Sequence, residues 1–304
     1  MSGAATSAPS AAAGEGAAPP EPPDGIVDAH HHLWDPSRRE YPWLAGVALA
    51  PIRRTYTVDD LRACTAPAGV EATVLVQTIS DLAETEEFLA TAAASDGLVA
   101  GVVGWVDLTA PDVADQLDRL RSGPGGDRLV GVRHQVEDEP DPDWMLRPAV
   151  QQGLAVVGAA GLVYDLLVRV DQLAAARAAA ERLPELRFVL DHAAKPPIAT
   201  GATEPWASEL AALAKRENTA CKLSGLVTEA SWDGWTVDDL RPYGEQVLTA
   251  FGPERVIFGS DWPVCELAAR YRDVVQAADT LTEQLSPTER AAVFAGNARR
   301  TYRL

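Results

Sequence analysis

Cysteine is scarce in this chain of 304 residues, and the three that occur, Cys64, Cys221 and Cys265, lie far apart. Without a C-x-x-C pair, neither a disulfide framework nor a thiolate zinc site is indicated, and reduced thiols in the cytoplasm are expected instead. No apolar run approaches the roughly 20 residues that a membrane span needs. Basic residues are also few: the chain has 26 Lys and Arg but 44 Asp and Glu, which gives a net charge of −18. This excess of acid argues against nucleic acid and anionic membranes as partners.

The chain divides into a short tail and one long domain. Residues 1–24 are rich in Ala, Ser, Gly and Pro and contain no Lys or Arg, which predicts a disordered tail and no secretory signal. Residues 25–304 alternate short apolar runs with longer stretches of helical spacing. We expect strands at 25–30, 72–77, within 98–107, and at 129–134, 162–168, 186–192, 219–224 and 255–260. We expect helices at 58–66, 82–95, 111–122, 143–152, 170–182, 205–217, 237–251, 268–283 and 287–300.

This order of elements predicts an α/β fold, a single-domain (β/α)8 TIM barrel with extra C-terminal helices. An open doubly wound sheet is the alternative, but neither a G-x-G-x-x-G nor a P-loop signature follows the first strand. Residues 33–54 are expected to form a long loop after the first strand. Loops on that face of a barrel tend to shape the active site.

Three of the five histidines stand in a row at positions 30 to 32, at the end of the first expected strand. Alternate strand residues face the same side, so His30 and His32 should point one way and His31 the other. Two imidazoles on one face are half of a metal site or of a proton-transfer site, whereas a merely solvated strand end is the plain alternative. The other two histidines, His134 and His192, also end expected strands. Strand ends are where barrel enzymes carry their catalytic groups.

Charged residues mark other strands in the same way. Asp261 follows the eighth strand, where it either caps the next segment or acts as a general base or metal ligand opposite His30. Lys222 lies inside an apolar strand, where a cation is costly unless it is paired, functional or able to reach water. Arg133 is suited to anchor a carbonyl or a hydroxyl-rich ligand. Of the eight tryptophans, only Trp262 is proposed to face a sugar-like ring.

Several motifs together resemble a known family. They are His30-x-His32, Gly131-Val132-Arg133, Asp191-His192-x-x-Lys195-Pro196, Cys221-Lys222-Leu223-Ser224-Gly225-Leu226 and Phe258-Gly259-Ser260-Asp261-Trp262-Pro263. The chain from about Ile26 to Leu304 resembles the amidohydrolase superfamily, in the amidohydrolase-related branch of L-fuconolactonase-like sugar lactone hydrolases. The resemblance implies a (β/α)8 barrel that hydrolyses small aldonolactones, with His30, His32, His192 and Asp261 at its centre.

The resemblance also bears on which metal cofactor, if any, is expected. The fourth strand offers Arg133-His134 and no carboxylate or lysine that could bridge two metals, so a two-metal site is not expected. One divalent metal, Zn²⁺, held by His30, His32, His192 and Asp261, and catalysis without metal are both open. The lactone is a less demanding substrate than an amide.

The expected reaction is direct attack of water on the lactone carbonyl. Asp261 would accept the proton of water, and His192 with Lys222 or Arg133 would stabilise the carbonyl oxygen. Lys195, Trp262, His134 and Arg133 are the expected substrate-binding residues. Lactone isomerisation, decarboxylation or amide hydrolysis on the same barrel, and a non-catalytic sugar-acid binding protein, are the alternatives. A homo-oligomer is left open.

Overall fold

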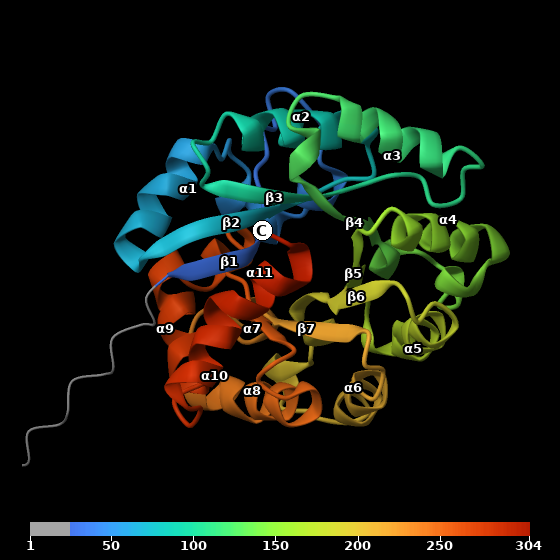
Figure 1. Ribbon diagram of the computed structural model, residues 1–304. Coiled ribbons are helices and arrows are strands. Elements are labelled where there is room, and N and C mark those ends of the chain that lie inside the picture. Colours follow the sequence, from blue (N-terminus) through green and yellow to red (C-terminus); the bar gives the residue numbers. More distant parts are fainter. Residues whose placement is uncertain (1–24) are drawn as a thin grey trace, which may run out of the picture.

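A computed structural model describes residues 25–304 and places eight parallel strands in one sheet, in the order β1 to β8 (Figure 1). The strands are β1 (Ile26–His31), β2 (Val70–Val76), β3 (Val99–Gly104), β4 (Leu129–Gln135), β5 (Val163–Leu167), β6 (Arg187–Leu190), β7 (Thr219–Leu223) and β8 (Val256–Phe258). Most of their apolar residues are buried, as in sheets covered on both faces. The predicted α/β (β/α)8 barrel is confirmed. The disordered tail expected for residues 1–24 lies outside the described residues.

The ring closes where the last strand meets the first. The backbone of His31 forms a parallel bridge with Trp262, and the amide of His32 donates to the Trp262 carbonyl at 2.7 Å. The amide of Asp261 donates to the His30 carbonyl at 2.8 Å. One oxygen of the buried Asp28 carboxylate accepts from the amides of both His30, at 3.1 Å, and Ser260, at 2.8 Å. The backbone on either side of this closure is therefore fixed by hydrogen bonds.

Most of the helices surround the ring (Figure 1). The helices are α1 (Val58–Thr65), α2 (Leu82–Ala93), α3 (Val113–Ser122), α4 (Pro148–Ala159), α5 (Leu173–Arg182), α6 (Trp206–Ala214), α7 (Leu226–Glu229), α8 (Val237–Phe251), α9 (Tyr271–Leu281), α10 (Pro287–Ala291) and α11 (Asn297–Tyr302). Among residues 25–304, no helix combines the length and the apolarity needed to cross a membrane.

Two of the predicted helices differ from those in the structure. The helix expected at 143–152 starts only at Pro148, after a short 3-10 turn at Trp144–Leu146. Arg147 is extended (ψ 136°), because a residue before proline is disfavoured in the helical region. The helix expected at 287–300 is interrupted by a short π-helical segment at Ala292–Gly296, which separates α10 from α11. The short helix α7 was not predicted at all.

The interior of the barrel is apolar at one end and polar at the other. Val27, Val103, Val163 and Ile257 belong to a buried cluster that Tyr302 of α11 joins. Figure 1 shows α11 lying across the middle of the ring of strands. Apolar side chains and this helix therefore fill one end, and the polar strand ends are left to form a site at the other.

Candidate active site

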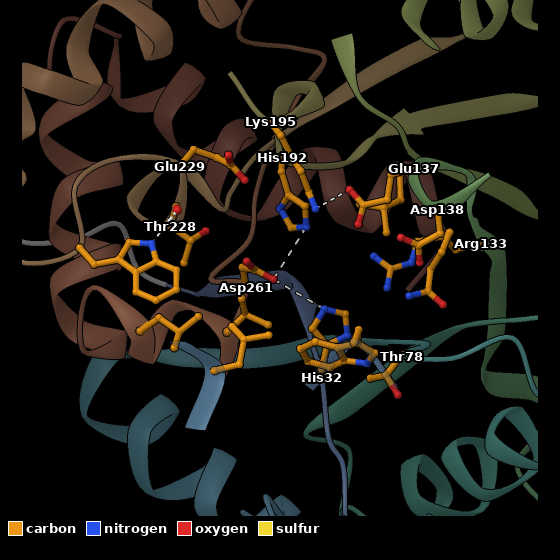
Figure 2. Close-up of a pocket in the computed structure, with 17 residues that line it drawn as sticks. His32, Thr78, Arg133, Glu137, Asp138, His192, Lys195, Thr228, Glu229 and Asp261 are labelled. Carbon is orange, nitrogen blue, oxygen red and sulfur yellow. Dashed lines mark hydrogen bonds and ion pairs between the residues drawn. The ribbon is translucent and has the colours of Figure 1, made fainter. Parts of the chain in front are cut away.

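A cavity of about 260 Å³ lies at the C-terminal ends of the strands (Figure 2). Five of the residues predicted for the site line it: His32, Arg133, His192, Lys195 and Asp261. Trp43 and Leu49 line it too, and both belong to the long first loop, which agrees with the role expected for that loop. The volume is at the small end of ligand-binding pockets, which suits a small substrate.

The structure brings the three imidazoles and the carboxylate together. Nε2 of His30 and Nε2 of His32 are 3.1 Å apart. Oδ1 of Asp261 lies 3.8 Å from the first, 3.6 Å from the second and 3.8 Å from Nε2 of His192. Thus β1 and the segments that follow β1, β6 and β8 bring nitrogen and oxygen atoms that could bind a metal to one point. His31 points away and contacts the Thr73 hydroxyl at 2.9 Å.

This arrangement fits a single divalent metal. Tetrahedral zinc with bonds of about 2.0–2.2 Å requires ligand atoms roughly 3.3–3.6 Å apart, close to the separations found here. The set His30, His32 and Asp261 is compact enough for one ion, and so is the set His30, Asp191 and His192. Either set has three protein ligands, which leaves a fourth position open for water or substrate, as in catalytic zinc sites.

The protonation states agree with this use. Burial lowers the pKa of His32 to about 3 and that of His192 to about 4, so both rings are neutral at neutral pH. Nδ1 of His32 donates to the Val76 carbonyl at 2.8 Å, which leaves the lone pair on Nε2. Nδ1 of His192 contacts the Ser224 hydroxyl at 2.9 Å. Because a hydroxyl can donate or accept, His192 can present either a lone pair or an N–H at Nε2.

The backbone that presents these groups is strained. His192, Ala193, Ala194 and Lys195 all have positive φ, between 49° and 60°, and Asp261 has φ 57°. This left-handed conformation costs roughly 1–2 kcal/mol for each residue with a side chain. Such strain tends to occur at functional sites, where the surrounding structure imposes it. It turns His192, Lys195 and Asp261 into the same cavity.

Two glycines allow the rings to sit where they do. A Cβ on Gly225, which has φ +67°, would lie 2.6 Å from Nδ1 of His192. A Cβ on Gly259 would lie 2.7 Å from the Cβ of His30. Both distances are far below van der Waals contact, so only glycine fits beside each imidazole.

A buried ionic network lies beneath His30. Nζ of Lys222 is 2.5 Å from Oδ2 of Asp165 and 2.9 Å from Oδ1 of Asp191. Nη1 of Arg133 donates to Oδ2 of Asp191 at 3.0 Å. Burial alone would raise the pKa of Asp191, but Lys222, His30 and Arg133 together hold it well below its ordinary value. Lys222 is fully buried and is not among the cavity residues.

The network also controls the tautomer of His30. Its Nδ1 lies 3.3 Å from Oδ1 of Asp191 and 3.0 Å from Nζ of Lys222. A hydrogen bond donated to Asp191 leaves Nε2 free as a ligand, whereas one accepted from Lys222 would place the proton on Nε2. The structure therefore places Lys222 next to a site histidine, at a distance from the substrate space.

Two other predicted residues stand outside the cavity wall. His134 stacks on Trp144 with ring centres 4.3 Å apart, and its Nε2 is 2.9 Å from Glu139. Trp262 is buried against Tyr56, and its indole nitrogen donates to Glu266 at 2.9 Å. Neither ring is among the residues that line the cavity. Lys195 does line it, and its Nζ pairs with Glu137 at 2.5 Å.

The sequence interpretation missed three carboxylates in the cavity wall, Glu137, Asp138 and Glu229. Each lies a few residues after the end of β4 or β7. Their position after a barrel strand is the signal that could have found them.

A further carboxylate, that of Glu84, fixes the connection between β2 and α2 by hydrogen bonds. Glu84 is fully buried and accepts from the amides of Thr78, at 2.8 Å, and Ile79, at 3.2 Å, as well as from the Thr78 hydroxyl. Burial raises the pKa of Glu84 to about 7. Thr78 lines the cavity, so this buried carboxyl supports one side of the site.

Fold and site together define the class: an enzyme of the (β/α)8 type whose histidine and carboxylate side chains converge at the strand ends. A family model described as Amidohydrolase matches residues 27–304. The chain belongs to the amidohydrolase family, and the resemblance seen in its motifs is confirmed.

Two curated relatives are similar over nearly the whole chain. An L-fucono-1,5-lactonase of Burkholderia ambifaria is 39% identical over 91% of this chain and 95% of that protein. An L-fucono-1,5-lactonase of Burkholderia multivorans is 38% identical over 91% of this chain and 96% of that protein. Among solved structures, an amidohydrolase of Burkholderia multivorans with bound Zn is 37% identical, with a TM-score of 0.85, over 92% of this chain and 99% of that one.

Proposed function

We propose that this enzyme hydrolyses a small sugar-derived lactone, an aldono-1,5-lactone of the L-fucono type. The observation that carries the proposal is the meeting of Asp261 with three imidazoles at a small cavity. The names of the two relatives support the substrate class, because both are L-fucono-1,5-lactonases similar over the whole barrel. The product would be the open-chain aldonic acid.

Asp261 is the proposed general base. Burial raises the pKa of its carboxyl above the ordinary value, which makes the carboxylate a better proton acceptor. A water in the cavity gives its proton to Asp261 as its oxygen attacks the lactone carbonyl. The proton then passes to the ring oxygen as the C–O bond breaks, which completes ring opening without a covalent intermediate.

His192 and Arg133 are proposed to stabilise the oxygen that becomes negative. Of the two cations expected to act with His192, Arg133 lines the cavity and Lys222 does not, which supports the guanidinium in this role. Nε2 of His192 donates to that oxygen when the Ser224 hydroxyl donates to its Nδ1. Lys222 instead acts through His30, which it contacts directly.

One divalent metal, with zinc as the first candidate, fits the ligand set His30, His32 and Asp261 or His30, Asp191 and His192. When bound, it would supply Lewis-acid polarisation and a lowered pKa of coordinated water. The solved relative with bound Zn supports this assignment. Lys195 is proposed to contact substrate hydroxyls; His134 and Trp262, both outside the wall, would support the cavity from behind. Cytoplasmic location and homo-oligomeric assembly stay predictions.

The test is a pH-indicator assay of purified protein with L-fucono-1,5-lactone and a set of aldonolactones, with and without a chelator. NMR of the product separates ring opening from isomerisation, decarboxylation and amide hydrolysis. Acid release well above the spontaneous rate, with the aldonic acid as product, is expected. Ligand-induced stabilisation without turnover of any lactone would contradict the proposal and favour a sugar-acid binding protein.

A further inference from the structure

Two carboxylates of the cavity wall, Asp138 and Glu229, have roles that the reaction does not explain, and of these Asp138 is exposed to solvent. Glu229 is the last residue of α7, the short helix that follows β7, and is half-buried. Figure 2 shows its carboxylate turned toward His192 and Asp261, on the side of the cavity away from Arg133. It lines the cavity together with the groups proposed to act on the lactone.

The cations of the wall already have partners. Nζ of Lys195 pairs with Glu137 at 2.5 Å, and Nη1 of Arg133 donates to Asp191 at 3.0 Å. Glu229 makes no side-chain hydrogen bond or ion pair with any residue between 25 and 304 that the structure describes. Its oxygens are thus acceptors that face the cavity without a protein donor, and a half-buried carboxylate gains from donors that a ligand brings.

Glu229 also lies at a boundary between two spaces. A second cavity of about 880 Å³ shares Glu137, Lys195 and Glu229 with the first and is otherwise lined by residues outside the site, among them Glu209 of α6. The shared residues form the wall that a substrate in the first cavity would touch. A substrate that reaches this wall therefore meets Glu229 close to the groups proposed to act on the lactone.

We infer that Glu229 is a specificity-determining residue that accepts hydrogen bonds from hydroxyl groups of a polyhydroxylated lactone. The inference rests on the proposed function and adds to it. An unpartnered carboxylate binds neighbouring O–H groups of a sugar ring and repels a carboxylate in the same place. A lactone without ring hydroxyls brings no donor to Glu229, so its turnover is independent of this side chain.

The test compares two lactones with the same ring. L-Fucono-1,5-lactone carries hydroxyls, and δ-valerolactone carries none. Burial raises the pKa of Glu229 to about 7, with Lys195 opposing the shift, so the assays are run at pH 8, where the carboxylate is mostly ionised. For the hydroxylated lactone, Glu229→Ala should lower kcat/KM by about 10- to 100-fold, chiefly through KM, since a hydrogen bond to a charged group is lost. Glu229→Gln keeps one acceptor oxygen and should lose less.

For δ-valerolactone both variants should retain the parental kcat/KM within about threefold, which a merely structural role for Glu229 would not allow. Glu209→Gln is the matched control, because Glu209 lines only the outer cavity. Equal losses on both lactones, or unchanged kcat/KM on the hydroxylated one, would overturn the inference. If the parent opens neither lactone, the proposed function has failed, and that outcome is distinct from the failure of Glu229.

Discussion

Replacing Asp261 with asparagine tests the proposed chemistry while leaving the fold in place. The amide has nearly the shape of the carboxylate, and asparagine tolerates the left-handed φ of 57° found at this position. Burial raises the pKa of Asp261 because the charged form is penalised. A neutral side chain removes that penalty, so we expect the thermal midpoint of Asp261→Asn to equal or exceed that of the parent.

The catalytic loss should be large. An amide cannot accept the proton of the attacking water, and loss of a general base typically costs a factor of about 10²–10⁴. That range corresponds to about 3–5 kcal/mol in the activation barrier. Because Oδ1 lies within 3.8 Å of the Nε2 atoms of His30, His32 and His192, the substitution would also weaken a metal held there.

The assay separates these two effects. The rate of lactone opening is measured with saturating Zn²⁺ and again after chelation, and bound metal is quantified in parent and variant. Asp238→Asn, which changes a carboxyl that is 86% exposed on α8, is the control. A rate for Asp261→Asn within about threefold of the parent, at equal metal content, would refute the role of general base.

Three further changes test the surroundings of the site. Lys222→Met leaves two buried carboxylates without their cation and should lower the free energy of unfolding by about 3–5 kcal/mol in urea titrations. Adding Asp165→Asn should restore part of that free energy, and no recovery would contradict the ion pair between Lys222 and Asp165. Gly225→Ala places a methyl group 2.6 Å from the His192 ring and should lower kcat by roughly 10²-fold, while the circular dichroism spectrum stays unchanged. A parental kcat would contradict the close packing of Gly225 against His192. Glu84 has a folded-state pKa of about 7 against 4.5 unfolded, so its contribution to stability is complete below pH 4.5 and lost as the pH rises through 7. Glu84→Gln mimics the protonated form. The difference in the free energy of unfolding between pH 4.5 and pH 8 should therefore be smaller by about 3 kcal/mol in this variant than in the parent. An unchanged difference would exclude Glu84 as its source.

Much of the barrel could be predicted because its strands are buried on both faces. Runs such as residues 72–77 and 129–134 carry that signal in their apolar residues alone. Strand ends then indicated His30, His192 and Asp261, since parallel strands all end on the same side of a barrel.

What could not be predicted depends on partners from distant strands or on backbone strain. Lys222 was noticed as a cation inside a strand, but only the fold shows that Asp165 and Asp191 lie on either side of it. Nothing in the residue types of the 192–195 segment favours four successive positive φ angles. Glu229 was missed because a one-turn helix carries little periodicity from which to predict it.

The closure of the barrel has a consequence for how the enzyme matures. His30 lies in β1, the first strand of the barrel, His32 directly follows it, and Asp261 follows β8, the last strand. The backbone bonds that join these segments lie among the proposed ligands themselves. A nascent chain therefore cannot assemble the His30, His32 and Asp261 set until the last strand of the barrel has been made. Metal capture through that set would follow folding, and the captured ion would then hold the two ends of the domain together.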